Sequence, residues 1–385
     1  MIDAIRTYHV ALPLERELRT AIHRIDRIDN VLVEISSGGR TGIGYAFAFN
    51  RQQAFAIRAA VHALGQVVQA QPEAGVLDQW QAMWQDLNFT GQAGIGVLAM
   101  NTIDTALWDL HAQEAGMPLF RLLGGSRTSL PLYATGGWIS YPLAELVEEG
   151  QRLKDQGFTH YKIKIGFDDW REDLRRLEEL QSAVGEGMAI QVDANQAWRV
   201  HDALAAGRAF QACGVYWYEE PTSADDIVGS AEIARELDVP IATGETVYGV
   251  PGFRRLIEGR AADVYMPDLM RCGGVTGFRD VAVFADAHHV PVSSHTFTEV
   301  SAHVMSATPN GTLVEYIPGW WDELFEGAPE VRDGRIHLSE TPGLGFRFSE
   351  EAKSKYGLGR RTGGLDTARR RRSGAIAPLR ECPAH

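Results

Sequence analysis

One pattern recurs eight times in the second part of the chain, and it constrains the fold more than any other feature of the sequence. From Leu130 onward, short runs rich in β-branched and aromatic residues alternate with amphipathic helical stretches. The runs are 130–134, 161–165, 189–193, 215–219, 240–243, 263–267, 291–295 and 312–316. Strands that are each followed by a helix, except after the last, predict a parallel (β/α)7β TIM-like barrel rather than a doubly wound sheet.

The first part of the chain predicts a different, α+β unit. Three strands are expected at Ile2–Val10, Asn30–Ser36 and Gly42–Phe49, the last following a Gly38-Gly39 turn. Apolar residues then recur at helical spacings of three and four between 54 and 110. We therefore expect an N-terminal α+β domain over residues 1–125 and a catalytic barrel over 126–356. The end of the chain, 357–385, is expected to be a basic, disordered tail.

Charge and cysteine content exclude several classes of function. The formal net charge is −13, whereas proteins that bind nucleic acid need a basic surface, so no nucleic-acid partner is expected. The three cysteines, Cys213, Cys272 and Cys382, are too far apart to form a disulfide framework, which fits a reducing cytoplasm. Neither a signal peptide nor an apolar run of membrane-spanning length is apparent, so no membrane partner is expected.

Three carboxylates end consecutive predicted strands at equal intervals. Asp193, Glu219 and Glu245 follow one another 26 residues apart, so each should lie at the same height in its βα unit. Barrel enzymes keep their active sites at this end of the strands. Each carboxylate alone could be a helix cap, but three crowded together would repel one another unless a cation lay between them. Mg²⁺ is the hard divalent ion that suits such oxygen ligands.

Lysine, histidine and further acids occupy the ends of other strands. Lys162 and Lys164 are two residues apart, so strand alternation places both on one face, where crowding by a second ammonium and a metal would lower a lysine pKa. Solvent-facing lysines remain the alternative. Asp268 and His295 end successive strands and could hydrogen-bond, which would fix the imidazole tautomer. Glu315, on the last strand, could donate a hydrogen bond to a substrate carboxylate if it stays protonated.

From about Ile2 to Tyr356, the chain resembles the mandelate racemase subgroup of the enolase superfamily. The most specific motifs are YKIKIG, VDANQ, WYEEP, TGE, MPD followed by GGVTGF, SSHTFTEVSAH and the glutamate of LVEY. The resemblance implies that the N-terminal domain caps the barrel, and that the chain after the last strand returns to this cap. It also implies that Asp193, Glu219 and Glu245 bind one Mg²⁺ per subunit.

The resemblance further implies a division of labour around the substrate. Lys164 would be the base on one face, and His295, paired with Asp268, the base on the other. Two side chains would contact the carboxylate being activated: Lys162 and Glu315. Asn195 would lie near the substrate hydroxyl.

Loops around Leu14–Arg24 and Ala46–Arg51 would set specificity, according to the same resemblance. The first of them is basic and polar, through Arg16, Arg19, His23 and Arg24. An aryl-binding lid would be more apolar, so mandelate is a poor candidate substrate. Arg19 and His23 are the candidate substrate-binding residues of this loop, and the alternative is that these charges face water.

The implied activity is Mg²⁺-dependent abstraction of the α-proton of a 2-hydroxycarboxylate, giving a metal-stabilised enediolate. Reprotonation from the opposite face would racemise or epimerise the substrate. If the β-carbon carries a hydroxyl, the same residues could instead expel water from an acid sugar and leave a 2-keto-3-deoxy acid. The motifs of the second half favour the racemase, whereas the polar lid favours the dehydratase.

Two hypotheses from other classes fit the sequence less well. A non-catalytic carboxylate-binding barrel would be expected to lack one of the bases, and this chain has both. A nicotinamide dehydrogenase is not supported, because Gly91, Gly94 and Gly96 do not have GxGxxG spacing after a strand. The expected partner is therefore a small-molecule carboxylate, and a homo-oligomer is expected by analogy with related barrels.

Overall fold

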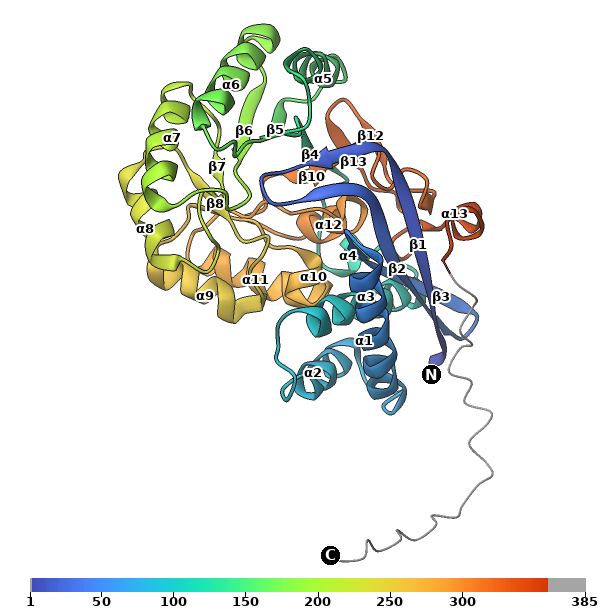
Figure 1. The fold of residues 1–385 in the computed structure, drawn as a ribbon. Helices are drawn as coiled ribbons and strands as arrows, with labels where there is room; N and C mark the ends of the chain where they lie inside the picture. The colour runs from blue at the N-terminus through green and yellow to red at the C-terminus, as the bar shows by residue number, and fades with distance from the viewer. Residues whose placement is uncertain (1, 359–385) are drawn as a thin grey trace, which may run out of the picture.

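The computed structural model describes residues 2–358. A ring of strands with helices on its outside occupies one side of the molecule, and an antiparallel sheet with its own helices lies against it (Figure 1). The part of the predicted tail from residue 359 onward lies outside the described residues. Among the described residues, no helix has the length and apolar character that crossing a membrane requires.

The N-terminal unit is a three-stranded antiparallel sheet in the order β1-β2-β3, covered by helices. Its elements are β1 (Ile2–Arg19), β2 (Arg24–Ser37), β3 (Arg40–Ala48), α1 (Arg51–Gln69), α2 (Val76–Asp86), α3 (Ile95–Glu114) and α4 (Leu119–Leu122). The turn between β2 and β3 has positive φ at both Gly38 and Gly39, 54° and 78°, as the glycine pair predicts. The three predicted strands are thus all present, and the first two are longer than expected.

Helix α3 packs closely on the sheet because two glycines of β3 admit it. A Cβ at Gly42 would lie 2.0 Å from the carbonyl oxygen of Ala106, and one at Gly44 would lie 2.1 Å from that of Thr102. A side chain at either position would therefore push the helix away. The GIG sequence fixes this packing.

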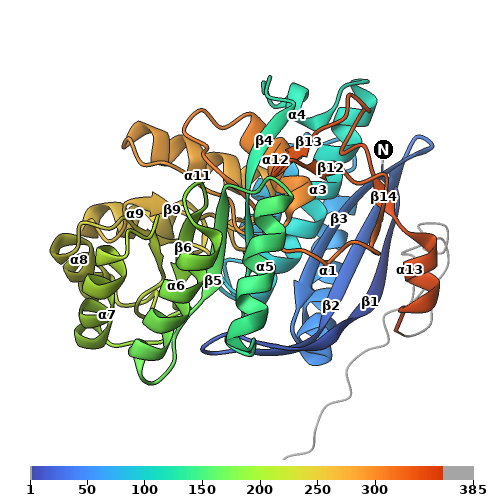
Figure 2. The ribbon, with the colours of Figure 1, turned by 90° about the horizontal axis from the view of Figure 1, so that it is seen from above.

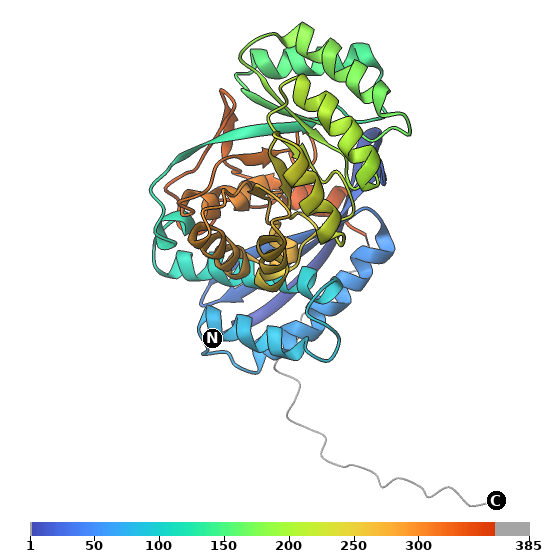
Figure 3. The same cartoon turned by 90° about the vertical axis from the view of Figure 1, so that its left-hand side faces the viewer.

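The barrel repeats strand and helix in the predicted order. Its strands are β4 (Ser129–Gly136), β5 (His160–Lys164), β6 (Ala189–Asp193), β7 (Tyr218–Glu219), β8 (Ile241–Thr243), β9 (Val264–Tyr265) and β10 (Val314–Tyr316). The helices are α5 (Leu143–Asp155), α6 (Trp170–Val184), α7 (Val200–Ala212), α8 (Ile227–Glu236), α9 (Gly249–Gly259), α10 (Leu269–Cys272), α11 (Val275–Ala287) and α12 (Thr298–Ser306). They cover the outside of the ring (Figure 3).

The seventh predicted strand, 291–295, closes the ring through separate bridges rather than as a continuous strand. Val292 pairs in parallel with Tyr265 and Gly311, and His295 pairs with Asp268. On the other side, β10 pairs in parallel with β4, so the circle of eight segments is complete. This arrangement confirms the (β/α)7β barrel with an N-terminal capping domain.

The chain after β10 runs back to the N-terminal sheet. It forms β11 (Phe325–Glu326), β12 (Glu330–Arg332), β13 (Arg335–His337), β14 (Arg347–Phe348) and α13 (Glu350–Lys355). Gly357 then bridges to Val10, and the amide of Leu358 donates to the carbonyl of His9 at 2.7 Å. The described end of the chain is therefore attached to β1.

The inside of the barrel, below the strand ends, is filled by apolar side chains. Five buried residues from different strand segments form one cluster: Tyr133, Trp217, Ala242, Met266 and Leu313. Such a layer makes a packed floor rather than a pore. Polar groups above it are consequently held in a dry environment.

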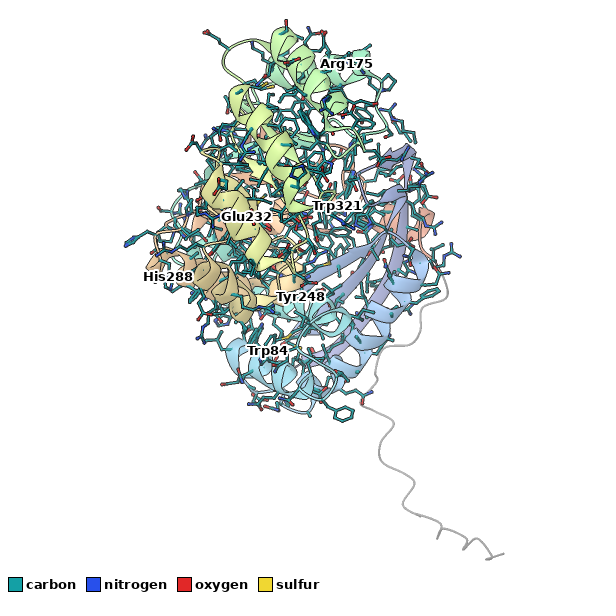
Figure 4. All side chains as sticks on the ribbon, turned by 60° about the vertical axis from the view of Figure 1, so that its left-hand side comes forward. Trp84, Arg175, Glu232, Tyr248, His288 and Trp321 are labelled. Carbon is teal, nitrogen blue, oxygen red and sulfur yellow. The ribbon has the colours of Figure 1, made fainter. Side chains whose placement is uncertain are left out.

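Polar side chains join the cap to the barrel in an otherwise apolar seam. Asp104 of α3 accepts hydrogen bonds from the amide and hydroxyl of Thr276, at 2.9 and 2.7 Å. Burial raises the pKa of Asp104 to about 7, although these hydrogen bonds oppose the rise. Trp321, labelled in Figure 4, donates from its indole to Asn30 of β2 at 3.0 Å. The two units are thus tied together at specific points.

The segment Leu14–Arg24, expected to be a loop, is mostly the end of a long β-hairpin. Strand β1 continues to Arg19 and β2 begins at Arg24, with an irregularity in the pairing between Pro13 and Leu18. The hairpin runs beside α5 and reaches across the barrel (Figure 2). Its pairing depends on contacts with the barrel, which is why local sequence signals did not predict it.

Candidate active site and metal centre

Strand register brings the predicted site residues to one level. Lys164 is the pairing partner of Asp193, and Asp193 is the partner of Glu219 on the next strand. Glu245 lies two residues beyond the end of β8, and Glu315 lies on β10. The site therefore sits at the carboxyl ends of the strands, as expected for a barrel enzyme.

The three predicted metal ligands converge. Asp193, Glu219 and Glu245 each offer an oxygen, these oxygens lie within 4.8 Å of one another, and all three side chains are buried. Glu245 Oε2 is buried and accepts no hydrogen bond, although His295 Nε2 lies 3.3 Å from it. Burial of crowded carboxylates is unfavourable unless a cation compensates them. An all-oxygen cluster with an unsatisfied atom fits Mg²⁺.

Neighbouring groups fix the orientation of two of these ligands. The backbone amide of Asn195 donates to Asp193 Oδ1 at 2.8 Å, and its side-chain amide donates to Oδ2 at 3.2 Å. The indole of Trp217 donates to Glu219 Oε2 at 3.0 Å. Asn195 Oδ1 is buried and has no partner, so this amide can still accept a hydrogen bond from a substrate hydroxyl. Trp217 is a contact that sequence reasoning missed.

Both predicted lysines point into the cluster. Lys162 Nζ lies 2.8 Å from Glu219 and 2.9 Å from Glu315, and Lys164 Nζ lies 2.5 Å from Asp193. Burial is the largest effect and lowers the pKa of Lys164, but Asp193, Glu245 and Glu219 together raise it more, so the net direction is upward. The sequence analysis predicted a lowered pKa from a second ammonium together with a metal ion. Among the protein groups alone, the facing carboxylates outweigh the second ammonium.

His295 is oriented by Asp268 as predicted. Its Nδ1 lies 2.8 Å from Asp268 Oδ2, and its Nε2 faces the cluster, 3.3 Å from Glu245 Oε2. Asp268 also caps α10 by accepting from the amide of Arg271 at 3.0 Å. Burial lowers the pKa of His295, but Glu245 and the hydrogen bond to Asp268 raise it, and the net pKa is raised. Asp268 therefore partners His295 as predicted and also caps α10, which the sequence analysis did not foresee.

Glu315 accepts hydrogen bonds rather than donating one. The hydroxyl of Thr135 donates to Oε1 at 2.5 Å, and the amide of Thr296 donates to Oε2 at 2.7 Å. Burial raises the pKa of Glu315, but Lys162 and His295 lower it further, to about 2. These protein groups therefore favour the ionised form of the carboxyl. Donation from a protonated Glu315 to a substrate carboxylate stays a prediction, and the two threonine donors belong to no motif that the sequence analysis recognised.

A buried carboxylate next to a metal ligand escaped the sequence analysis. Glu220 accepts hydrogen bonds from Gln196 at 3.2 Å and from Thr246 at 2.9 Å, so it connects the loops that follow three successive strands. Burial raises its pKa to about 8, and Glu245 and Asp193 act in the same direction. The second glutamate of WYEEP was a signal that could have found it.

An aromatic wall extends from the site toward the cap. The Lys164 ammonium lies 5.9 Å from the centre of the Trp138 ring, which stacks on Trp320 at 5.6 Å. Phe49 meets Trp320 at 6.0 Å and His23 at 5.2 Å. The lid is consequently less polar than the sequence suggested. These aromatic residues come from distant segments, so no local pattern brings them together.

Of the predicted lid residues, His23 lies nearest the site's charges. Partial burial lowers its pKa, Glu245 opposes this, and Lys164 and Arg271 lower it further. Arg19 contributes its backbone, since its amide donates to Ser140 Oγ at 3.2 Å. Within residues 2–358, the Arg19 guanidinium makes no hydrogen bond or ion pair. The His23 ring is therefore close enough to the cluster for Glu245 and Lys164 to affect its pKa.

Arg16 attaches the hairpin to the barrel. Its guanidinium forms a bidentate ion pair with Glu145 of α5, one contact being 2.7 Å, and stacks 4.1 Å from the centre of the Tyr141 ring. A cleft of about 1050 Å³ lies between this part of the hairpin, α5 and residues 318–323. The cleft reaches Thr135, Trp138 and Trp320, but none of the metal-binding carboxylates lines it. It therefore lies beside the cluster and not over it.

Models of two protein domains match most of the chain. The mandelate racemase/muconate lactonizing enzyme N-terminal domain matches residues 2–124. The enolase C-terminal domain-like family matches residues 145–352, which include every predicted metal ligand and base. The matches thus cover both the cap and the barrel.

Curated relatives and solved structures agree with these matches. L-talarate/galactarate dehydratase of Salmonella typhimurium is 38% identical over 68% of this chain and 66% of its own length. The 3,6-anhydro-alpha-L-galactonate cycloisomerase of Streptomyces coelicolor is 31% identical over 93% of this chain and its whole length. Among solved structures, a racemase from Streptomyces coelicolor with bound magnesium is 30% identical and has a TM-score of 0.87. The match covers 93% of this chain and the whole of the racemase chain. The prediction of Mg²⁺ as cofactor is confirmed at this level.

Proposed function

The chain belongs to the mandelate racemase/muconate lactonizing enzyme family of the enolase superfamily, and on that premise we propose that it removes the α-proton of a 2-hydroxycarboxylate. Asp193, Glu219 and Glu245 would hold the Mg²⁺. When bound, this ion supplies positive charge beside the substrate carboxylate and so stabilises the negative charge that develops there.

Lys162 would neutralise part of that charge. It is fully buried, and its ammonium already lies between Glu219 and Glu315, at 2.8 and 2.9 Å. Burial lowers the pKa of Lys162, but Glu219 and Glu315 raise it well above the usual value, which favours the charged ammonium. A fixed ammonium in a water-poor site stabilises developing negative charge without reorganisation.

The two bases would serve opposite faces of the substrate. Lys164 comes from β5 and His295 from the segment 291–295, and at least two strands separate them in either direction around the ring. A carbon held between them could lose a proton to one and gain a proton from the other. This placement of an amine and an imidazole on separate sides of a three-carboxylate cluster is the observation that carries the proposal.

We infer that the substrate is an acid sugar and that the preferred outcome is dehydration to a 2-keto-3-deoxy acid. Two of the relatives bear names of enzymes that act on sugar acids or their anhydro derivatives. His295 would then protonate the departing hydroxyl after Lys164 removes the α-proton, or the roles would be reversed. Asn195, with its free carbonyl oxygen, would accept a hydrogen bond from a substrate hydroxyl.

Racemisation or epimerisation is the second candidate. It needs the same two bases and no leaving group, and a structure described as a racemase shares the whole fold. Incubation with Mg²⁺ and both enantiomers of glucarate, arabinonate and mandelate in D₂O distinguishes the outcomes. Formation of a 2-keto acid supports dehydration. Deuterium at the α-carbon supports racemisation if mandelate loses its optical rotation, and epimerisation if glucarate or arabinonate yields its α-epimer. Binding without either result would contradict both and leave a non-catalytic barrel.

A further inference from the structure

Two charged side chains of α6, Asp173 and Arg176, are buried against the strand that carries Lys164. Arg176 is 5% exposed and Asp173 is fully buried. The chemistry proposed above uses neither of them. Charged groups are rarely buried without partners, so their partners indicate what the pair does.

Arg176 binds backbone at the ends of two neighbouring strands. Its Nη1 donates to the carbonyl oxygen of Lys164 at 3.1 Å, and its Nη2 donates to those of Gly137 and Trp138, at 3.1 and 3.0 Å. The register of β4 with β5 ends at Ile163, and beyond it the Gly137 carbonyl also accepts a hydrogen bond from the Lys164 amide at 3.3 Å. The guanidinium therefore adds contacts where the ladder between the two strands ends.

Asp173 binds the turn that follows Lys164. Its Oδ2 accepts hydrogen bonds from the amides of Gly166 and Phe167, at 3.0 and 2.9 Å. Gly166 has a φ of 119°, and a Cβ there would lie 2.7 Å from the side chain of Ala21 at the hairpin tip. The turn is therefore held from the barrel side by Asp173 and closely covered by the cap.

We propose that Asp173 and Arg176 are positioning residues for the Lys164 side of the reaction. Together they hold the backbone at Lys164 and at the turn that follows it, and they hold the carbonyl of Trp138, whose ring borders the Lys164 ammonium at 5.9 Å. His295 is held by a separate hydrogen bond, from its Nδ1 to Asp268. The pair should consequently affect proton removal on one substrate face. This inference rests on the proposed function, in which Lys164 is a base.

The kinetic test uses Arg176→Gln and Arg176→Lys in the full-length, Mg²⁺-loaded enzyme. The matched control is Arg175→Gln, an exposed arginine on the same helix that is labelled at the outer edge of the barrel in Figure 4. The probes are both enantiomers of glucarate, arabinonate and mandelate, with α-proton exchange in D₂O as readout. Lys164→Ala identifies which enantiomer loses its proton to Lys164.

For the enantiomer that loses its proton to Lys164, Arg176→Gln should lower kcat by about 10- to 100-fold with little change in KM. Misplacing a catalytic group by about 1 Å can lower a rate by this much. Exchange from the other enantiomer should fall by less than about threefold. Arg176→Lys should recover part of the loss, and Arg175→Gln should match the wild type. Equal losses on both faces, or no loss on either, would overturn the proposal.

A second readout does not depend on substrate. Amide hydrogen exchange measured by mass spectrometry should be faster in Arg176→Gln at residues 137–140 and 162–168, and unchanged at 293–298. Unchanged protection in the first two segments, or a uniform rise in all three, would overturn the assignment. If the single variant does not fold, Asp173→Asn/Arg176→Gln removes both buried charges and is tested in its place.

The two proposals fail in different ways. If the wild type exchanges no α-proton from any probe, the proposed function fails and the positioning role falls with it. If the wild type exchanges protons and Arg176→Gln behaves like the wild type on both faces, only the positioning role fails.

Discussion

The strand ends of the barrel and the β1–β2 hairpin face each other across the site, yet they are held in different ways. Lys162, Asp193 and Glu219 are fully buried, and strand register and several hydrogen bonds set their positions. The hairpin end is attached by the ion pair of Arg16 with Glu145, whose side chains are 43% and 35% exposed, and by hydrogen bonds of the Arg19 backbone with Ser140 and Ile139. The first region is rigidly determined by the fold, and the second depends on a few solvent-accessible contacts.

This difference suggests a division of roles. Groups that must act on a proton need positions fixed to within fractions of an ångström, which a packed barrel provides. Groups that only select a substrate can lie on an element with weaker attachments, because selection tolerates more variation. We therefore expect substitutions at the strand ends to affect the rate of chemistry, and substitutions in the hairpin to affect substrate affinity.

Removing either base should have the largest effect. Lys164→Ala and His295→Asn should each lower α-proton exchange on one substrate face by about 10²- to 10⁴-fold, because a general base contributes this much. Exchange on the opposite face should remain measurable, and Mg²⁺ binding should be kept. Stereospecific exchange in D₂O followed by NMR measures both faces. Full activity of both variants would refute the two-base scheme.

Weakening the metal site should have the next largest effect. Glu219→Gln removes one anionic ligand and should raise the dissociation constant for Mg²⁺ by at least about tenfold, because affinity depends on ligand charge. Isothermal titration with Mg²⁺ measures this directly. Treatment with EDTA should abolish wild-type activity, and added Mg²⁺ should restore it. Activity that persists in EDTA would contradict the metal assignment.

Detaching the hairpin should have a smaller effect, mainly on KM. Arg16→Ala and Glu145→Ala should each raise KM a few-fold and leave kcat nearly unchanged. Their coupling energy in a double-mutant cycle should be about 0.5 kcal/mol, as for partly exposed ion pairs. The cycle is measured through KM and through the free energy of unfolding. A drop in kcat as large as that of the base variants would break the division between the two regions.

Substitution of His23 should have the smallest effect, and the pKa of this residue decides how that effect depends on pH. Because the pKa lies below the ordinary value of 6.5, the ring is neutral at pH 7 and above. His23→Gln should therefore change KM by about threefold or less, because at most one hydrogen bond to the substrate is lost. The ratio of the variant KM to the wild-type KM should stay the same from pH 7 to 8.5. KM profiles over this range for both proteins are the measurement. A difference that grows with pH in this range would show that the ring titrates there.

The sequence predicted the strand ends well because their signals are local and repeat. Asp193, Glu219 and Glu245 each follow a short β run, and strand alternation alone placed Lys162 and Lys164 on one face. Once the barrel is assumed, these positions converge without further information. The outcome is a buried cluster formed by the residues that the sequence singled out as metal ligands.

The sequence predicted the hairpin and the residues that surround the site poorly, because their contacts link distant segments of the chain. Thr135 and Thr296 reach Glu315 from two other strand ends, and neither belongs to a pattern that predicts a carboxylate partner. The sequence analysis missed these two donors to Glu315 for this reason. The aromatic wall around Trp138 and Trp320 likewise depends on the cap packing on the barrel.

The most direct measurement of the central claim is the fate of the α-proton in wild-type enzyme loaded with Mg²⁺ in D₂O. With at least one enantiomer among glucarate, arabinonate and mandelate, we expect either deuterium at the α-carbon of recovered acid or a 2-keto acid product. If the enzyme binds Mg²⁺ and these acids but yields neither, the barrel does not abstract an α-proton from this class of substrate.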